Sequence, residues 1–240
     1  MRLFLRLLGW GLLGVSCTAC FNAEDYETAD PAIVHMLTTA GKASANGDST
    51  LRVQARVSND AARSRRKILF KTSLGFFKAN QADTLTVDAG EDFMAEADVA
   101  SVRTGPAEVT ARAGGVEAQE KAVLAFEQAY PSSVTVSVDS FAISNRLNNQ
   151  LTITATLKSG SRGKPSVGHP VRFDVLAGNT PVGNFLNGIS SAATDANGVA
   201  KIRYSPGGVT TIGNLNVVAT TATASGAPIS ATTYFYLYRR

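Results

Sequence analysis

The stretch Leu51-Arg52-Val53-Gln54-Ala55-Arg56-Val57 alternates strictly between apolar and polar residues. Successive side chains of a β-strand point to opposite faces, so this period of two buries one face of the segment and leaves the other in water. The same alternation returns at residues 151–157, Leu-Thr-Ile-Thr-Ala-Thr-Leu. Both stretches therefore predict β-strands that lie on a core.

Further strand-like segments recur in the same order in both halves of the chain. They match residues 68–70 with 171–173, 93–99 with 199–204, 107–111 with 215–219 and 122–126 with 232–237. A constant order at a spacing of 100 to 111 residues indicates a tandem duplication. Because the strands are short and separated by turn residues, we expect an all-β chain with one β-sandwich in each copy.

One turn signal stands out in the second copy. Residues 194–198, Thr-Asp-Ala-Asn-Gly, place Asn-Gly between two strand-like runs. Both residues tolerate positive φ, so the stretch predicts a β-hairpin, and residues 88–92 stand at the equivalent place of the first copy. A calcium loop needs several carboxylates, whereas Asp195 is the only charged residue in this stretch, so a turn is the preferred interpretation.

Three stretches beside alternating strands carry a family resemblance. They are residues 41–50 (GKASANGDST), 194–199 (TDANGV) and 213–219 (GNLNVVA). These stretches resemble bacterial Ig-like domains of the invasin/intimin type, and the resemblance covers nearly all of residues 31–237. It implies two tandem Ig-like β-sandwich domains, stacked end to end as in the stalks of cell-surface adhesins. It implies no receptor specificity, because the lectin-like tip of those adhesins has no counterpart in this sequence.

The first copy departs from that pattern in two places. Residues 90–92 are Gly-Glu-Asp where the Asn-Gly turn is expected, and residues 63–67 are Arg-Ser-Arg-Arg-Lys where the family often has a neutral loop. Arginine forms bidentate contacts with phosphate, so this cluster is a candidate contact for lipopolysaccharide phosphates or an acidic partner. A solvated loop between strands is the alternative. The candidate residues are Arg63, Arg65, Arg66 and Lys67.

The amino-terminal residues read as an export signal. Arg2 and Arg6 give a basic start, followed by an uncharged, mostly apolar run at residues 7–16. Ten residues of helix reach about 15 Å, half of a bilayer core, so the run is too short to span a membrane. A basic start, a short apolar run and small residues before a cleavage site describe a secretory signal peptide, predicted at residues 1–16.

Both cysteines lie where this signal ends. Residues 13–17, Leu-Gly-Val-Ser-Cys, resemble a bacterial lipobox, and Cys17 is the predicted lipidation site because the apolar run abuts it. Cys20 is the alternative. The acidic, polar residues that follow indicate a flexible tether, so residues 17–30 are predicted to be the lipidated cysteine and its tether. Several acyl chains would hold the protein firmly on a membrane.

The remaining chain divides into two domains of opposite charge. We assign the Ig-like domains to residues 31–129 and 131–240. Residues 21–130 hold 12 Lys+Arg and 16 Asp+Glu, a net of −4, whereas residues 131–240 hold 9 and 3, a net of +6. The isoelectric point near 9.2 therefore describes neither domain. Complementary charge favours head-to-tail packing, with solubility alone as the alternative.

No catalytic or metal-binding arrangement is visible in the sequence. His35 and His169 lie in different copies, neither beside a nucleophile motif, and two histidines cannot complete a three-ligand zinc site without carboxylates. No phosphate-binding glycine motif occurs. We therefore expect a non-enzymatic protein with no catalytic residues, no metal and no cofactor. Nucleic acid is not an expected partner, because basic and aromatic residues do not interleave.

The chain ends in an alternating segment, Tyr-Phe-Tyr-Leu-Tyr at residues 234–238. Tyr234, Tyr236 and Tyr238 share one face of the predicted strand. If this face points outward it is a candidate interaction patch, and otherwise it covers a sandwich edge or the domain junction.

Together these features predict a lipid-anchored protein of the bacterial cell envelope, in the outer membrane and facing either the periplasm or the surface. The leading hypothesis is a spacer or adhesion and protein-interaction module, with the membrane and another envelope or surface protein as partners. The alternative is a glycan- or polysaccharide-binding surface lipoprotein. Its aromatic platforms would be Phe76, Phe77 and the C-terminal tyrosines.

Overall fold

The computed structural model describes residues 33–38, 41–59, 61, 63 and 66–239, and of the side chains in 33–38 it describes only Met36. The predicted signal peptide, both cysteines, the tether and Arg65 lie outside the described residues. Residues 31–240 belong to one compact unit. Its described elements are β-strands and one short 3₁₀ turn, η3 (Leu186–Gly188), so the prediction of an all-β fold is confirmed.

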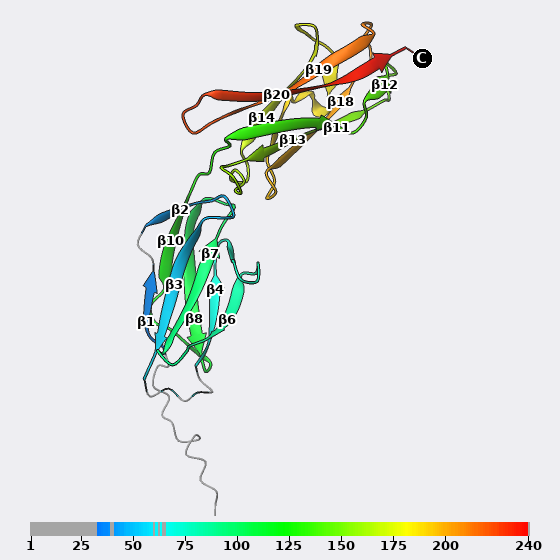
Figure 1. The fold of residues 1–240 in the computed structure, drawn as a ribbon. Helices are drawn as coiled ribbons and strands as arrows, with labels where there is room; N and C mark the ends of the chain where they lie inside the picture. The colour runs from blue at the N-terminus through cyan, green and yellow to red at the C-terminus, as the bar shows by residue number, and fades with distance from the viewer. Residues whose placement is uncertain (1–32, 39–40, 60, 62, 64–65, 240) are drawn as a thin grey trace, which may run out of the picture. The chain divides into compact units, whose positions relative to one another are not determined.

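The first sandwich, β1 to β10, consists of two sheets (Figure 1). One sheet has the strand order β1 (Ile33–Thr38), β3 (Thr50–Val57), β7 (Met94–Ala100) and β5 (Phe76–Phe77). The other has the order β2 (Lys42–Ser44), β10 (Ala122–Glu127), β8 (Gly105–Ala113), β4 (Lys67–Thr72) and β6 (Thr84–Asp88), with β9 (Val116–Glu117) paired to β8.

The second sandwich, β11 to β20, is built in the same way. One sheet has the order β11 (Ser133–Val138), β13 (Leu151–Lys158), β18 (Val199–Ser205) and β16 (Asn184–Phe185). The other has the order β12 (Ala142–Ser144), β20 (Pro228–Tyr238), β19 (Gly213–Ala222), β14 (Pro170–Ala177) and β15 (Thr180–Pro181), with β17 (Ser191–Ala193) paired to β14.

The two sandwiches also agree in the register of their central strands. Phe70 of β4 lies opposite Ala111 of β8, and Phe173 of β14 lies opposite Ala219 of β19. A ring therefore stands over an alanine at the same place in each sheet. A one-residue slip would turn the whole buried set of a strand to the solvent, which is why each core holds this register.

Each sandwich has a hydrophobic core of its own, built from the predicted alternation. In β3 the apolar residues are buried and Arg52 and Arg56 are exposed, and β13 has the same buried set from Leu151 to Leu157. The largest buried side chains are Phe70, Phe77, Ile68 and Leu124 in the first core and Tyr204, Phe173, Phe235 and Leu215 in the second. Each such side chain contributes about 1.5–3 kcal/mol by leaving water.

The prediction of a β-hairpin at residues 194–198 is wrong, although a turn does form there. Strand β17 before it pairs with β14, whereas β18 after it pairs with β13 and β16, so the turn links the two sheets. The Asp195 carboxylate accepts from the backbone N–H of Asn197 (2.7 Å) and of Val199 (3.0 Å). This side-chain bonding stabilises a turn between sheets as well as within one.

A loop of the second sandwich, between β13 and β14, is hydrogen-bonded to the first sandwich. The backbone N–H of Lys164 donates to the carbonyl of Asn46 at 3.1 Å, and that of Val167 donates to Val102 at 2.8 Å. These bonds come from the main chain, so no side-chain pattern in the sequence predicts them. We call residues 163–168 the docking loop.

Candidate functional sites: a basic pocket and a tyrosine face

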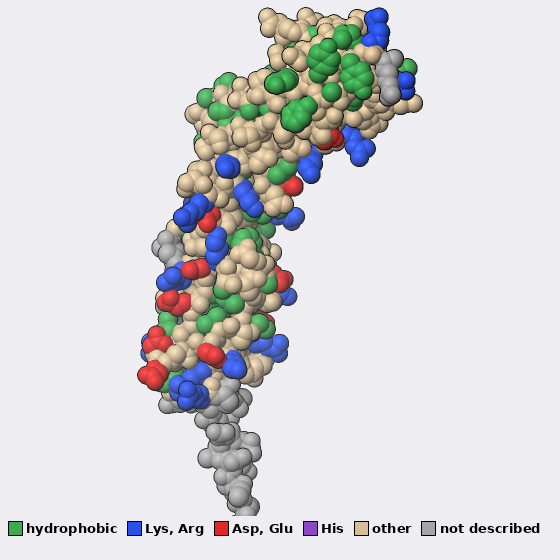
Figure 2. Space-filling view, turned by 45° about the vertical axis from the view of Figure 1, so that its right-hand side comes forward, with side chains coloured by type: hydrophobic (Ala, Val, Ile, Leu, Met, Phe, Trp, Pro, Cys, Tyr) green, Lys and Arg blue, Asp and Glu red, His purple; other side chains and the backbone are tan. Residues whose placement is uncertain are grey.

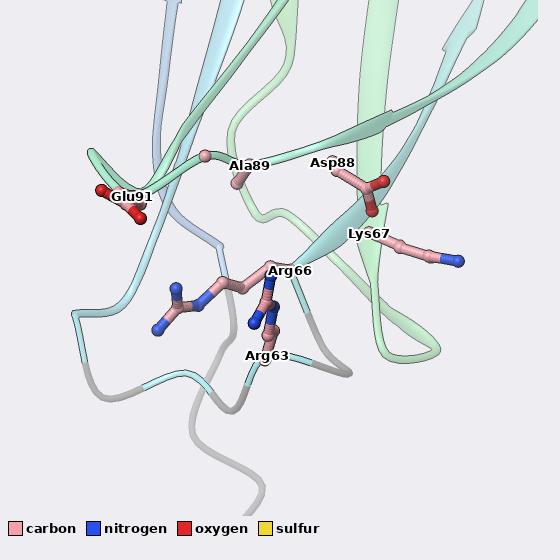
Figure 3. A pocket seen from close by; sticks show the side chains of 7 residues that line it. Arg63, Arg66, Lys67, Asp88, Ala89 and Glu91 are labelled. Atoms are coloured by element: carbon pink, nitrogen blue, oxygen red, sulfur yellow. The ribbon is translucent and has the colours of Figure 1, made fainter.

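A cavity of about 440 Å³ opens between the β3–β4 loop and the turn after β6 (Figure 3). It contains three of the four basic residues predicted as an interaction cluster. The charged residues that line it are Arg63, Arg66, Lys67, Asp88 and Glu91. We call this cavity the basic pocket.

The basic side chains of the pocket have no carboxylate at ion-pair distance among the described residues. Lys67 lies opposite Asp88 in the β4–β6 register without forming an ion pair. Arg52 of the same sandwich behaves differently, because it bonds Asp98 at 3.0 Å and Glu96 at 3.1 Å. The hydrogen bond to Asp98 raises the pKa of Arg52. The pocket, in contrast, presents cationic donors that an anion can accept from.

Arg66 also supports the turn after β6. Its Nε donates to the Ala61 carbonyl at 3.1 Å, and its guanidinium carbon lies 4.3 Å from the centroid of the Phe93 ring. A cation over a ring at this distance contributes about 0.5–1 kcal/mol at a partly exposed site. Phe93 packs on the first core while its φ is +60°, a conformation that is uncommon for a bulky residue.

Phe93 holds the position of Gly198 in the second copy. The N–H of Phe93 donates to the Gly90 carbonyl, and the N–H of Gly198 donates to the Asp195 carbonyl in the same turn pattern. Gly198 has a φ of +72°, so both residues adopt the left-handed region. The absence of Asn-Gly from the first copy could be read in the sequence, but the left-handed phenylalanine that replaces the glycine could not.

The residue that matches Arg66 in the second copy is His169. The N–H of Ala89 donates to the Arg66 carbonyl, and the N–H of Thr194 donates to the His169 carbonyl. His169 is buried, where its ring meets Tyr130 edge-on at 6.0 Å between centroids.

The ring of His169 has a close side-chain partner inside the second sandwich. Its Nε2 lies 2.8 Å from the Thr221 hydroxyl. Burial lowers the pKa of His169, and a backbone hydrogen bond at Ala222 partly opposes that shift. Among the described residues, no group of three or more His, Cys, Asp or Glu side chains is placed to hold a metal ion.

The three C-terminal tyrosines lie on the outward face of β20. Tyr234, Tyr236 and Tyr238 are 58%, 46% and 37% exposed, while Phe235 and Leu237 between them are buried. Figure 2 shows hydrophobic side chains gathered on the surface of the second sandwich. The structure therefore places the tyrosines and the basic cluster on different sandwiches. The other proposed platform is mostly closed, because Phe77 is fully buried in the first core.

Within the part of the chain that the structure describes, there is no helix long and apolar enough to cross a membrane.

No protein-family model and no curated protein sequence matches the chain. Several solved structures do match it. Invasin, a bacterial integrin-binding protein, is 18% identical with a TM-score of 0.52, and the match covers 86% of this chain and 39% of invasin. The adhesin InvE of Yersinia pseudotuberculosis is 20% identical with a TM-score of 0.49, over 85% of this chain and 60% of InvE. The D0-D1 domain of intimin is 20% identical with a TM-score of 0.32, over 85% of this chain and 98% of that one.

The chain thus spans less than two thirds of the length of the invasin and InvE structures. At these identities the likeness is one of fold. The two sandwiches, their repeated strand order and the match to invasin lead to one conclusion: this chain has the bacterial Ig-like fold of the invasin/intimin type.

Proposed function

We propose that this chain is a non-enzymatic, lipid-anchored protein of the bacterial cell envelope, whose Ig-like sandwiches act as a spacer and as an adhesion or protein-interaction module. The lipobox-like sequence that ends at Cys17 supports the anchor. The fold supports the module, since InvE is described as an adhesin and invasin as an integrin-binding protein. The outer membrane is the proposed location, with either side of it open.

The observation that carries the spacer role is the docking loop. Ser166 in this loop is buried, and its hydroxyl accepts from the Ala129 N–H at 2.8 Å and donates to the Ala45 carbonyl at 3.0 Å. One side chain thus joins the second sandwich, the connecting segment and the first sandwich. A spacer transmits position only if its parts are tied in this way.

The junction can be tested with Ser166→Ala. The change leaves two buried backbone groups without this partner, which costs about 2 kcal/mol. We expect faster subtilisin cleavage between the two sandwiches than in the wild type. Ser132→Ala, at an exposed serine near the same segment, should leave the cleavage rate unchanged. Equal cleavage of all three proteins would contradict a tied junction.

The anchor can be tested by labelling growing cells with an alkyne fatty acid. We expect the wild-type protein to carry the label, Cys17→Ser to lose it, and Cys20→Ser to keep it. Loss in Cys20→Ser alone would move the anchor to the alternative cysteine. A mature protein that is soluble and unlabelled would overturn the anchor.

For the basic pocket we propose contact with phosphate groups of the membrane surface. Ile33 pairs with Val57, so the chain enters the first sandwich at the end where the β3–β4 loop begins. The equivalent loop of the second sandwich is the docking loop, which contacts the first sandwich, the domain that precedes it in the chain. The segment that precedes the first sandwich carries the proposed anchor, so its basic loop would meet the membrane.

This contact can be tested on the full chain with both cysteines changed to serine. We expect it to bind vesicles that contain phosphatidylglycerol or lipopolysaccharide, and not vesicles of phosphatidylcholine alone. Arg63→Gln with Lys67→Gln should weaken binding about thirtyfold, because each basic residue near an anionic surface contributes about 1 kcal/mol. Arg146→Gln with Lys158→Gln removes the same charge from the second sandwich and should have little effect. Equal losses of vesicle binding in the two double variants would mean that net positive charge, and not the basic pocket, attracts the protein to the vesicles.

A further inference from the structure

The outward face of the β19–β20 pair carries three tyrosines in a row. Tyr234, Tyr236 and Tyr238 stand at every second position of β20, so their rings repeat at about 6.7 Å along the strand. The row is about 13 Å long, more than one sugar ring and comparable with a short oligosaccharide. The rings cannot turn inward, because Phe235 and Leu237 occupy the core side of the same strand.

Two asparagines complete this row on the neighbouring strand. Asn216 is the cross-strand partner of Tyr234, and Asn214 is the partner of Tyr236. Directly opposite residues share a face, with Cβ atoms about 5 Å apart. Both asparagines are exposed, and their amides and the three phenol hydroxyls have no hydrogen-bond partner among the described residues. We call these five residues the Tyr–Asn face.

The Tyr–Asn face has no charge of its own. The outward residues are Asn, Asn, Val, Thr and Ala on β19 and Pro, Ser, Thr and three Tyr on β20. On the next strand, Arg172 and Asp174 neutralise each other in an ion pair of 3.1 Å. The second copy as a whole is basic, with 9 Lys+Arg against 3 Asp+Glu in residues 131–240, so the neutrality is local.

The equivalent face of the first sandwich provides a contrast. The outward residues of β8 and β10 there include Glu108, Arg112 and Glu127, and no aromatic residue. The register places Val123 at the position of Tyr234, because Leu124 faces Ala107 as Phe235 faces Leu215. The scaffold therefore does not require tyrosines or neutrality at these positions.

We infer that the Tyr–Asn face binds an uncharged glycan chain. Tyrosine rings stack on the apolar C–H faces of sugars, and asparagine amides exchange hydrogen bonds with sugar hydroxyls. An apolar protein surface laid on this face would leave five polar side chains without hydrogen-bond partners, whereas sugar hydroxyls can satisfy them. Nucleic acid fits poorly, because its affinity depends on neutralising phosphates with Lys and Arg.

The inference goes beyond the anchor and spacer roles and does not depend on them. It is tested with the purified full chain in detergent on an array of neutral hexose oligosaccharides, with sialylated and sulfated glycans as the charged set. We expect binding to neutral oligosaccharides of three or more units, insensitive to salt. Binding to charged glycans only, or to none, would overturn the inference.

Variants separate the face from the rest of the protein. Tyr236→Ala should weaken binding of the best neutral oligosaccharide about tenfold, as for the loss of one stacked ring. Asn216→Ala should weaken it about fivefold, as for one hydrogen bond. Val123→Ala, at the first-sandwich position that corresponds to Tyr234, should leave binding unchanged. Equal melting temperatures would show that the variants fold.

Two further results would count against the glycan. Unchanged affinity in both Tyr234→Ala and Tyr236→Ala would place binding elsewhere. A protein partner that requires Tyr236 and is not displaced by the oligosaccharide would make the face a protein interface. Either result leaves the fatty-acid labelling of Cys17 untouched, so failure of this inference is distinguishable from failure of the anchor.

Discussion

The two sandwiches repeat the same strand order but differ in one loop, which precedes β4 in the first sandwich and β14 in the second. In the second sandwich, the loop before β14 binds the first sandwich through its backbone and Ser166. In the first sandwich, the loop before β4 carries Arg63 and Arg66 on a cavity. The position of Arg66 is that of His169. The duplicated scaffold has thus kept its strand order and register and changed its loops, which is where a new partner can be met without unfolding the protein.

The hydrophobic cores of the two sandwiches also differ, at one equivalent buried position. Tyr204 is fully buried in the second core, and the residue at its position in the first core is Val99. The tyrosine hydroxyl donates to the Val182 carbonyl at 3.0 Å, so its polar end is satisfied. The phenol takes up space against Gly183, which makes this glycine a sensitive point of the second sandwich alone.

The largest expected effect therefore belongs to Gly183→Ala. A Cβ at this position would overlap the Tyr204 phenol, and the φ of +71° adds backbone strain. We expect the free energy of unfolding of the second sandwich to fall by about 3 kcal/mol. Calorimetry should show this as a lower melting temperature for that sandwich. Gly178→Ala is the matched control, because its φ of +61° is similar and its Cβ would meet open space. Equal losses in the two variants would contradict steric overlap.

A smaller loss is expected at high pH. Burial raises the pKa of Tyr204 to about 12, above its usual value of 10.0. The folded state thus favours the neutral phenol, so this contribution is complete below pH 10 and is lost as the pH rises toward 12. We expect the second sandwich to lose about 2 kcal/mol over this range. Tyr204→Phe should make the free energy of unfolding less dependent on pH between 10 and 12. An unchanged dependence would mean that other groups cause it.

At Phe93, whose φ is +60°, we expect glycine to be a more stable replacement than alanine. Phe93→Ala keeps the strained φ and removes the ring, whereas Phe93→Gly removes both. We expect the glycine variant to be about 1 kcal/mol more stable than the alanine variant in urea unfolding, the reverse of the usual order within a strand. Alanine as the better substitute would mean that the turn relaxes to negative φ.

The smallest expected effect concerns His169 at low pH. Its pKa is lowered mainly by burial, so the folded state disfavours the charged ring. Stability should therefore be complete above the unfolded value of 6.5 and fall as the pH drops below it. Tyr130, Thr194 and Thr221 surround this position. His169→Gln should remove this acid dependence in a thermal scan, and a persistent dependence would point to carboxylates.

The sequence was sufficient where structure follows from side-chain alternation. Residues 51–57 and 151–157 show which side chains face the cores, and the matched segments indicate the duplication. The turn at residues 194–198 was placed correctly, but alternation does not say which sheet a strand joins, so the hairpin was wrong. The docking loop is not predictable from alternation, because most of its hydrogen bonds come from the backbone.

The candidate sites divide along the same line. Alternation alone put Tyr234, Tyr236 and Tyr238 on one face, but whether that face points outward depends on Phe235 and Leu237 filling the core. The basic run predicted a cluster of charge. Its cavity, and the use of Arg66 to support Phe93, depend on a turn that lies more than twenty residues later in the chain.

The pairing of β2 with β10 has a mechanical consequence. These strands, near the beginning and the end of the first sandwich, run parallel and join Lys42–Ser44 to residues 125–127, with an ion pair between Lys42 and Glu127 at 2.6 Å. A pull applied to the start of β2 and the end of β10 slides these strands along each other, so their hydrogen bonds bear the load together. This pairing therefore resists shear along the axis of the two strands.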